Sequence, residues 1–191
     1  MGVFDEALRK RLEQQPAIDA ETERQRQAAR EKDAHDVRVA REATDLFEGA
    51  AAFLGAEDVP TLPIVSYSRY PRAGESAWRF LGFGWALGRV CVSSDGRASE
   101  LPQIKPFGSE SLARSGAIAS AAGAGLSAIE RQHLERSDQY IEVVGLQDPP
   151  RMPRRIQVNV VWMDESAEYI PTSAYLTEAV ADRVARHRAA R

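Results

Sequence analysis

The stretch SAWRFLGFGWALGRVCVSSDGRASELPQI, residues 76–104, decides the fold. It holds two of the three tryptophans, the single cysteine and the clearest turn signal of the chain. That turn is Asp95-Gly96, which lies between runs of alternating apolar residues, and such a pattern is the strongest short-range signal for a β-hairpin. We therefore expect two antiparallel strands, one on each side of Asp95-Gly96.

The register of this hairpin depends on the length of its loop. A two-residue type I′ loop would pair Val92 with Ser99 and Val90 with Leu101. Because side chains alternate along a strand, Val90, Val92 and Leu101 would then share one face of the sheet. The other face would carry Arg89, Cys91, Ser93, Ala98 and Glu100. Pro102 has no N–H to donate, so we expect the second strand to end there.

The run from Trp78 to Leu87 is apolar on both alternating sets of positions. Such a strand is either covered on both faces or bent. Gly82, Gly84 and Gly88 favour bending, because glycine inside a strand often marks a bulge or a close approach of another backbone. We expect this to be the most deeply buried strand.

Length and composition indicate an ordinary globular protein with an extension. The chain has 191 residues, a net charge of -3 and one cysteine, so it cannot form an internal disulfide. The first 15 residues are charged and predict no secretory signal. No run approaches the roughly 20 apolar residues that a membrane helix needs. We expect a soluble, cytoplasmic protein that does not enter a membrane.

Two helices are predicted before the sheet. Residues 1–15 have helical apolar spacing, and Pro16 is expected to interrupt them. Residues 17–54 then form a long helix with a polar first half, so residues 1–57 would be a helical extension that projects from an α+β domain at residues 58–191. Its second half has an apolar stripe, which we predict to be an interface: Val37, Ala40, Thr44, Phe47, Ala51 and Leu54.

Residues 115–129 carry no charge and consist mostly of alanine, glycine and serine. They are compatible with a flexible linker, a closely packed helix or a lid. Because glycine disfavours helices, we expect residues 115–124 to be mobile and residues 125–136 to be helical.

Alternating apolar residues predict further strands at 64–70, 139–146 and 155–163, and we expect the last two to pair antiparallel. A helix follows Pro171. The predicted fold is therefore α+β, with a mostly antiparallel sheet of five to six strands. We expect the C-terminal helix and the second half of the long N-terminal helix to pack against this sheet.

The sequence contains no recognisable catalytic motif. Glu130 and His133 have the Glu-x-x-His spacing of di-iron proteins, but the second such pair that those sites require is missing. Cys91 has no histidine nearby in sequence and is expected to be a packed thiol. We predict no catalytic residue, no metal site and no cofactor.

One cluster combines basic and aromatic residues. Rings can stack on bases while arginine neutralises phosphate, so an exposed sheet face of this composition could bind single-stranded nucleic acid. The candidate residues are Tyr67, Arg69, Tyr70, Arg72, Trp78 and Arg79. A core strand with arginines along its edge would explain the same pattern. Burial of Tyr67 and Trp78 in the core would remove the nucleic-acid hypothesis.

Three functional hypotheses follow. The first is a non-enzymatic assembly or adaptor protein that self-associates through its N-terminal helix, or binds a protein partner. The second is the single-stranded nucleic-acid-binding module. The third is a hydrolase whose site combines Glu142, Asp164 and Glu165 with residues 115–124 as a lid. The absence of a reactive motif favours a protein without enzymatic activity.

Overall fold

The structure is a computed structural model. It describes residues 3–71, 77–108, 112–147, 155–160 and 167–191. The candidates Arg72, Asp164 and Glu165 lie outside these ranges. The chain forms two compact units, Met1–Arg41 and Glu42–Arg191, and helix α1 (Val3–Ala56) contributes to both.

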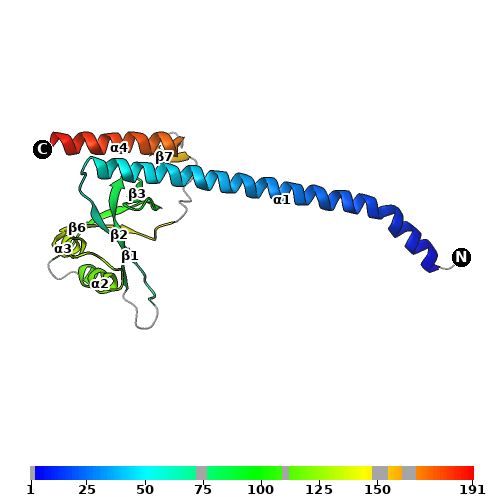
Figure 1. The fold of residues 1–191 in the computed structure, drawn as a ribbon, viewed down its shortest axis with the longest axis horizontal. Helices are drawn as coiled ribbons and strands as arrows, with labels where there is room; N and C mark the ends of the chain where they lie inside the picture. Colours follow the sequence, from blue (N-terminus) through cyan, green and yellow to red (C-terminus); the bar gives the residue numbers. More distant parts are fainter. Residues whose placement is uncertain (1–2, 72–76, 109–111, 148–154, 161–166) are drawn as a thin grey trace. The chain divides into compact units, whose positions relative to one another are not determined.

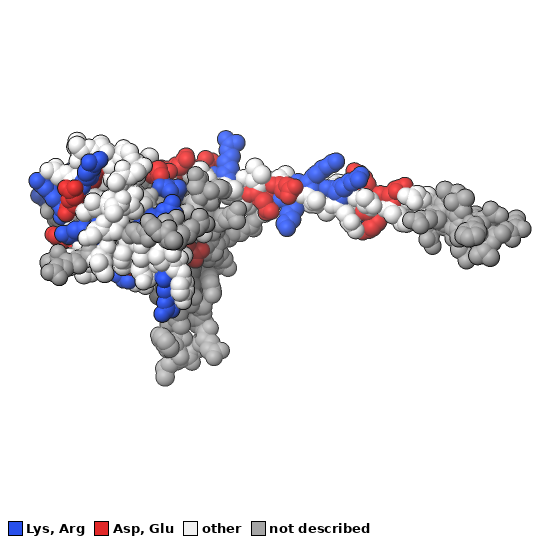
Figure 2. All heavy atoms as spheres, turned by 90° about the horizontal axis from the view of Figure 1, so that it is seen from below, with Lys and Arg blue, Asp and Glu red and all other residues white. Residues whose placement is uncertain are grey.

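The part of α1 that lies in the first unit is a polar helix. It continues through Pro16, so the predicted interruption there is wrong (Figure 1). Proline removes one backbone hydrogen bond, and the neighbouring Leu, Glu, Gln and Ala residues are all strong helix formers. The side chains of residues 23–38 are exposed, and acidic and basic groups are interspersed among them (Figure 2).

The second unit has a mixed, mostly antiparallel sheet in the order β4-β3-β2-β1-β6-β5. Its strands are β1 (Leu62–Tyr67), β2 (Trp78–Leu87), β3 (Val90–Ser93), β4 (Ala98–Glu100), β5 (Gln103–Pro106) and β6 (Gln139–Val143). Only the pair β1–β6 is parallel among these neighbours. The predicted α+β fold with a C-terminal helix and a long N-terminal helix is confirmed.

Strands β7 (Arg155–Val160) and β8 (Ala167–Pro171) pair with each other in a separate two-stranded sheet. The predicted pairing of residues 139–146 with residues 155–163 is therefore wrong. Strand β6 instead pairs with β1 and β5. The connection from β7 to β8 is short, and closing a short loop costs less conformational entropy than closing a long one.

The six-stranded sheet closes on itself. Its two end strands, β4 and β5, are consecutive in the chain, and a bend containing Leu101 and Pro102 joins them. Strand β5 pairs with β6, and an isolated antiparallel bridge pairs Ala98 of β4 with Gln147 beyond β6. Two backbone hydrogen bonds of 2.9 and 3.4 Å form this bridge. The segment β4–β5 is thus one bent strand that closes a small barrel.

The β3–β4 hairpin has a different register from the predicted one. Its loop has three residues, because the Ser93 N–H donates to the Arg97 carbonyl at 2.8 Å and the Gly96 N–H to the Ser93 carbonyl at 3.0 Å. Only Gly96 takes a positive φ, +82°, as in a loop that ends in a G1 bulge. Val90 therefore pairs with Glu100 and not with Leu101.

This shift of one residue exchanges the faces of the second strand. Ala98 pairs with Val92 and joins its buried cluster, whereas Leu101 is 60 % exposed. The predicted placement of Ala98 and Leu101 is wrong for this reason. The predicted alternation of Val90 and Val92 with Cys91 holds, since Cys91 belongs to a different buried cluster.

The predicted bend in β2 is confirmed as a bulge. Ile64 pairs with Gly82 and the next residue, Val65, pairs with Phe80, so Leu81 is the extra residue. Gly82 has a φ of +135° at this point. The bulge brings Phe80 and Phe83 to the same face, where their ring centroids lie 5.2 Å apart.

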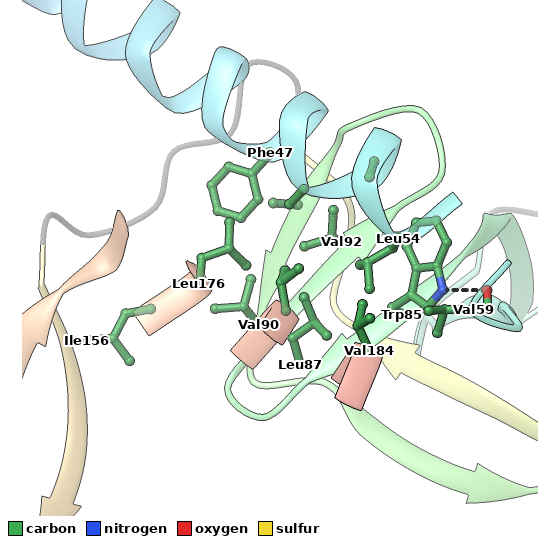
Figure 3. Packing of buried hydrophobic residues seen from close by; sticks show 14 residues of the cluster. Phe47, Leu54, Val59, Trp85, Leu87, Val90, Val92, Ile156, Leu176 and Val184 are labelled. Carbon is green, nitrogen blue, oxygen red and sulfur yellow. Dashed lines mark hydrogen bonds between the residues drawn. The ribbon is translucent and has the colours of Figure 1, made fainter. Parts of the chain in front are cut away.

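Helices cover this sheet in two places. Residues 47–54 of α1 and the C-terminal helix α4 (Thr172–Ala189) share a cluster with Trp85, Leu87 and Val92 (Figure 3). Helix α2 (Leu112–Ala121) contributes to a second cluster, which contains Phe80 and Phe83. A third cluster, with Ile64, Cys91, Ile141 and Val143, lies on the opposite face of the strands, inside the closed sheet.

Helix α2 covers most of the segment that was expected to be mobile, so that expectation is wrong. Ala113, Ala117 and Ala121 form its buried stripe. Small side chains let the helix approach β2 closely, and this packing outweighs the low helix propensity of its glycine. The predicted helix that follows is confirmed as α3 (Ala128–Arg136).

Candidate functional site

The predicted interface stripe on α1 is divided by burial. Phe47, Ala51 and Leu54 are buried in the chain's own core. Ala40 and Thr44 are half-buried, and Val37 is 69 % exposed. The last turns of α1 therefore use this face to hold the sheet.

An open apolar groove lies on the neighbouring face of the same turns. Helices α1 and α4 run side by side in the same direction (Figure 1), and a bidentate ion pair between Arg188 and Glu57, at 2.7 and 2.9 Å, joins their C-terminal ends. The groove between them has a volume of about 620 Å³. Its lining residues are Asp45, Leu46, Gly49, Ala50, Phe53, Leu176, Thr177, Val180, Ala181, Val184, Ala185 and Arg188.

Charge and exposure in this groove are unevenly distributed. Asp45 and Arg188 are its only charged lining residues, and they belong to opposite ends of it. Phe53 is 49 % exposed, although its neighbour Leu54 is completely buried. Sequence reasoning missed the groove, because its two walls lie more than 120 residues apart and the apolar residues of each wall alone predict a helix face that packs on the core.

Two rings of the basic and aromatic cluster come together. Tyr67 and Trp78 are paired across β1 and β2, and their ring centroids lie 4.7 Å apart. Tyr140 meets Trp78 edge-on at 6.1 Å. Tyr67 is 50 % exposed and Trp78 is half-buried, so neither is enclosed in the core. The burial that would have removed the nucleic-acid hypothesis is not observed.

Not all arginines of this cluster lie on the sheet face that carries the rings of Tyr67 and Trp78. Arg79 pairs with Ser66, one position along β2 from Trp78, so alternation directs it to the other face. Arg69 lies beyond the end of β1 and is exposed, as is Tyr70 at 85 %. The structure therefore joins Tyr67 with Trp78 and separates Arg79 from them.

Of the three acidic residues proposed for a hydrolase, only Glu142 lies among the residues that the structure describes. Glu142 forms an ion pair with Lys105 at 2.8 Å, and this hydrogen bond raises the pKa of Lys105. Burial, together with the nearby Glu142 carboxylate, raises the pKa of Tyr140. In the parts of the chain that the structure describes, no group of three or more His, Cys, Asp or Glu side chains could hold a metal ion.

The other side chains considered for chemistry, Cys91, Glu130 and His133, pack in the core or form hydrogen bonds that stabilise the fold. Cys91 is enclosed in the barrel, and burial raises the pKa of its thiol to about 12. Glu130 forms a capping box with Ser127 at the start of α3. The Nε2 atom of His133 lies 3.0 Å from the carbonyl oxygen of Thr61, a geometry in which the ring N–H donates. Glu130 and His133 thus have separate structural partners.

Comparison of the chain with protein-family models, with curated protein sequences and with solved structures found no match. Within the described ranges, no helix combines the length and the apolar character that crossing a bilayer requires.

Proposed function

We propose that this chain is a non-enzymatic assembly protein that self-associates through helix α1. The observation that supports the proposal is the length of α1, 54 residues, together with the exposure of its side chains from residue 23 to residue 38. Most helical stability in proteins comes from packing of one face, and this part of α1 packs on nothing in the described part of its own chain. A partner helix would supply that packing.

The sequence of α1 marks the face on which a partner would pack. Ile18, Ala29, Ala40 and Ala51 recur every 11 residues, which in an α-helix is close to three full turns. Ala51 is the member of this stripe that lies in the core. Ile18 is 51 % exposed and Ala29 is also exposed, so the same stripe is open further along the helix.

Light scattering on the full chain over a wide range of concentration tests the proposal. We expect the wild-type mass to exceed that of one chain, and Ala29→Glu to lower it. Ala28→Glu is the matched control, because it makes the same change at an exposed residue about 100° around the helix. A wild-type chain that is monomeric at all concentrations, or equal effects of the two substitutions, would contradict the proposal. Removing residues 1–55 would be a poor test, because it deletes Phe47 and Leu54 from the core.

A second candidate function, binding of single-stranded nucleic acid, is supported by the accessible pair Tyr67 and Trp78. Stacking of one base on an aromatic side chain contributes roughly 1–3 kcal/mol. In a fluorescence-anisotropy titration with a labelled single-stranded oligonucleotide, we expect Tyr67→Ala to weaken binding about tenfold or more. Tyr67→Phe should retain the affinity. Binding that is equal in all three proteins, or absent from the wild type, would contradict this function.

A further inference from the structure

We propose that the α1–α4 groove is a second self-association surface, in which two copies of the chain pair about a two-fold axis and the Phe53 side chain of each copy enters the groove of the other. The groove lies on a different face of α1 from the stripe that contains Ala29 and Ala51. The two contacts can therefore be separated by mutation. The inference extends the proposed self-association and assigns a site to it.

The shape of the groove suits an aromatic side chain. Gly49, Ala181 and Ala185 are small residues among its lining, so two packed helices leave open space there. Phe53 borders this space with half of its surface exposed. Leu176, Val180 and Val184 at the base of the groove are buried, so Phe53 is the side chain that can act as an aromatic anchor, the kind of residue that dominates binding at interfaces.

The positions of the two charged residues of the groove favour a second copy of the chain as the molecule that binds there. Asp45 lies about 16 Å along α1 from Ala56, at 1.5 Å per residue, and Arg188 is bonded to Glu57 just beyond that end. A two-fold axis perpendicular to the helices reverses their direction, so Asp45 of each copy would face Arg188 of the other. A parallel arrangement would place Asp45 against Asp45. The charges therefore favour the antiparallel, self-complementary pairing.

Arg188 can take part without giving up its existing partner. Its Nε and Nη2 atoms bind Glu57, and a guanidinium group has five N–H donors. Its side chain is also 66 % exposed. The second terminal nitrogen is thus available to the carboxylate of Asp45 in the other copy.

Disulfide trapping in the full chain tests this arrangement. In the double variant Asp45→Cys, Arg188→Cys, the two cysteines of one chain lie too far apart to bridge, since a disulfide needs Cα atoms about 4.4–6.8 Å apart. Cys91 is buried and its thiol stays protonated, so it does not compete. We expect mild oxidation to give a covalent dimer of the double variant. Neither single variant should give one, because like residues lie at opposite ends of the antiparallel pair.

Three further substitutions, each added singly to the double variant, test whether the covalent dimer depends on the groove or on the stripe. Phe53→Glu should reduce the yield of covalent dimer at least tenfold, whereas Ala52→Glu should not, because Ala52 is exposed and does not line the groove. Ala29→Glu should leave the yield unchanged. No dimer in the double variant, equal dimer in Asp45→Cys alone, or a yield indifferent to Phe53→Glu would each overturn the inference. Self-association that depends on Ala29 alone would then leave the proposed function standing.

Discussion

The hydroxyl group of Tyr175, on α4, occupies the space where a side chain on Gly88 would be. Gly88 is the first residue of the two-residue loop between β2 and β3, and it has a φ of +63°. The Tyr175 hydroxyl accepts a hydrogen bond from the N–H of Arg89 at 2.8 Å and donates one to the carbonyl of Leu87 at 3.2 Å. One phenol thus ties α4 to both sides of this turn.

Replacing Gly88 by alanine should destabilise the fold. The left-handed backbone costs an L-residue about 1–2 kcal/mol, and the new Cβ would displace the Tyr175 hydroxyl, whose hydrogen bonds are worth about 1 kcal/mol each. We expect a loss of roughly 2–4 kcal/mol in the free energy of unfolding, measured by urea denaturation. Gly55→Ala is the control, because nothing lies within 4 Å of its Cβ position. A loss below about 0.5 kcal/mol for Gly88→Ala, the range of ordinary surface changes, would contradict this reading.

The hairpin at Asp95-Gly96 shows which part of the fold could be predicted from sequence. The existence of the turn, and of the bulge near Gly82, follows from local chemistry. The register does not, because a loop with one left-handed residue and a loop with two are both compatible with Asp-Gly. A Cβ on Gly96 would lie 2.6 Å from the Cγ atom of Glu48, on α1, so a contact with a distant helix also requires glycine there.

The groove and helix α2 also show that local sequence patterns do not predict contacts between distant segments. Gly116 and Gly123 indicated a mobile segment, but the packing of Ala117 and Ala121 against the sheet makes most of it helical. The groove exists only because α1 and α4 lie side by side, and no pattern within either helix specifies that neighbour. Periodicity identifies which residues are buried, but it does not identify what buries them.

Removing the hydroxyl of Ser120 should destabilise the contact between α2 and the bulged strand. The Ser120 hydroxyl accepts a hydrogen bond from the N–H of Phe80 at 2.7 Å and donates to the carbonyl of Ala117 at 2.9 Å. The bulge disturbs the strand ladder beside Phe80, so the side chain replaces a backbone acceptor. Ser120→Ala should cost about 1–3 kcal/mol in the free energy of unfolding. Ser115→Ala, at an exposed position of the same helix, should change it by less than about 0.5 kcal/mol. Equal effects would refute the role of this hydroxyl.

Cys91 should report opening of the barrel. Its thiol is buried beside Ile64 and Ile141 with a pKa raised to about 12, and only the thiolate reacts readily with disulfide reagents. In native buffer near neutral pH, we expect labelling of Cys91 to be slow and to accelerate in urea in parallel with unfolding. The exposed cysteine of the variant Ala52→Cys should react at once under the same conditions. Rapid labelling of the native wild-type chain would show that the barrel opens more easily than its packing implies.

Asp95 should make the stability of the β3–β4 hairpin depend on pH. Its carboxylate accepts hydrogen bonds from the Ser93 hydroxyl and from Arg97 Nε, the latter at 2.8 Å, and Arg97 Nη2 donates to the carbonyl of Leu81 at 2.9 Å. Partial burial alone would raise the pKa of Asp95, but the hydrogen bonds from Arg97 and Ser93 outweigh it and lower the pKa below its ordinary value.

The sign of the pH effect follows from that lowered pKa. The unfolded chain takes up a proton at Asp95 at a higher pH than the folded chain does, so this group stabilises the fold above the ordinary carboxyl pKa of about 3.9. Its contribution is lost as the pH falls through the lower, folded value. Asp95→Asn keeps the size of the side chain but cannot carry the charge. The variant should therefore be less stable than the wild type at neutral pH, and the difference should shrink on acidification. Urea denaturation of both proteins across this pH range measures the difference, and a difference that stays constant with pH would show that the charge of Asp95 does not contribute.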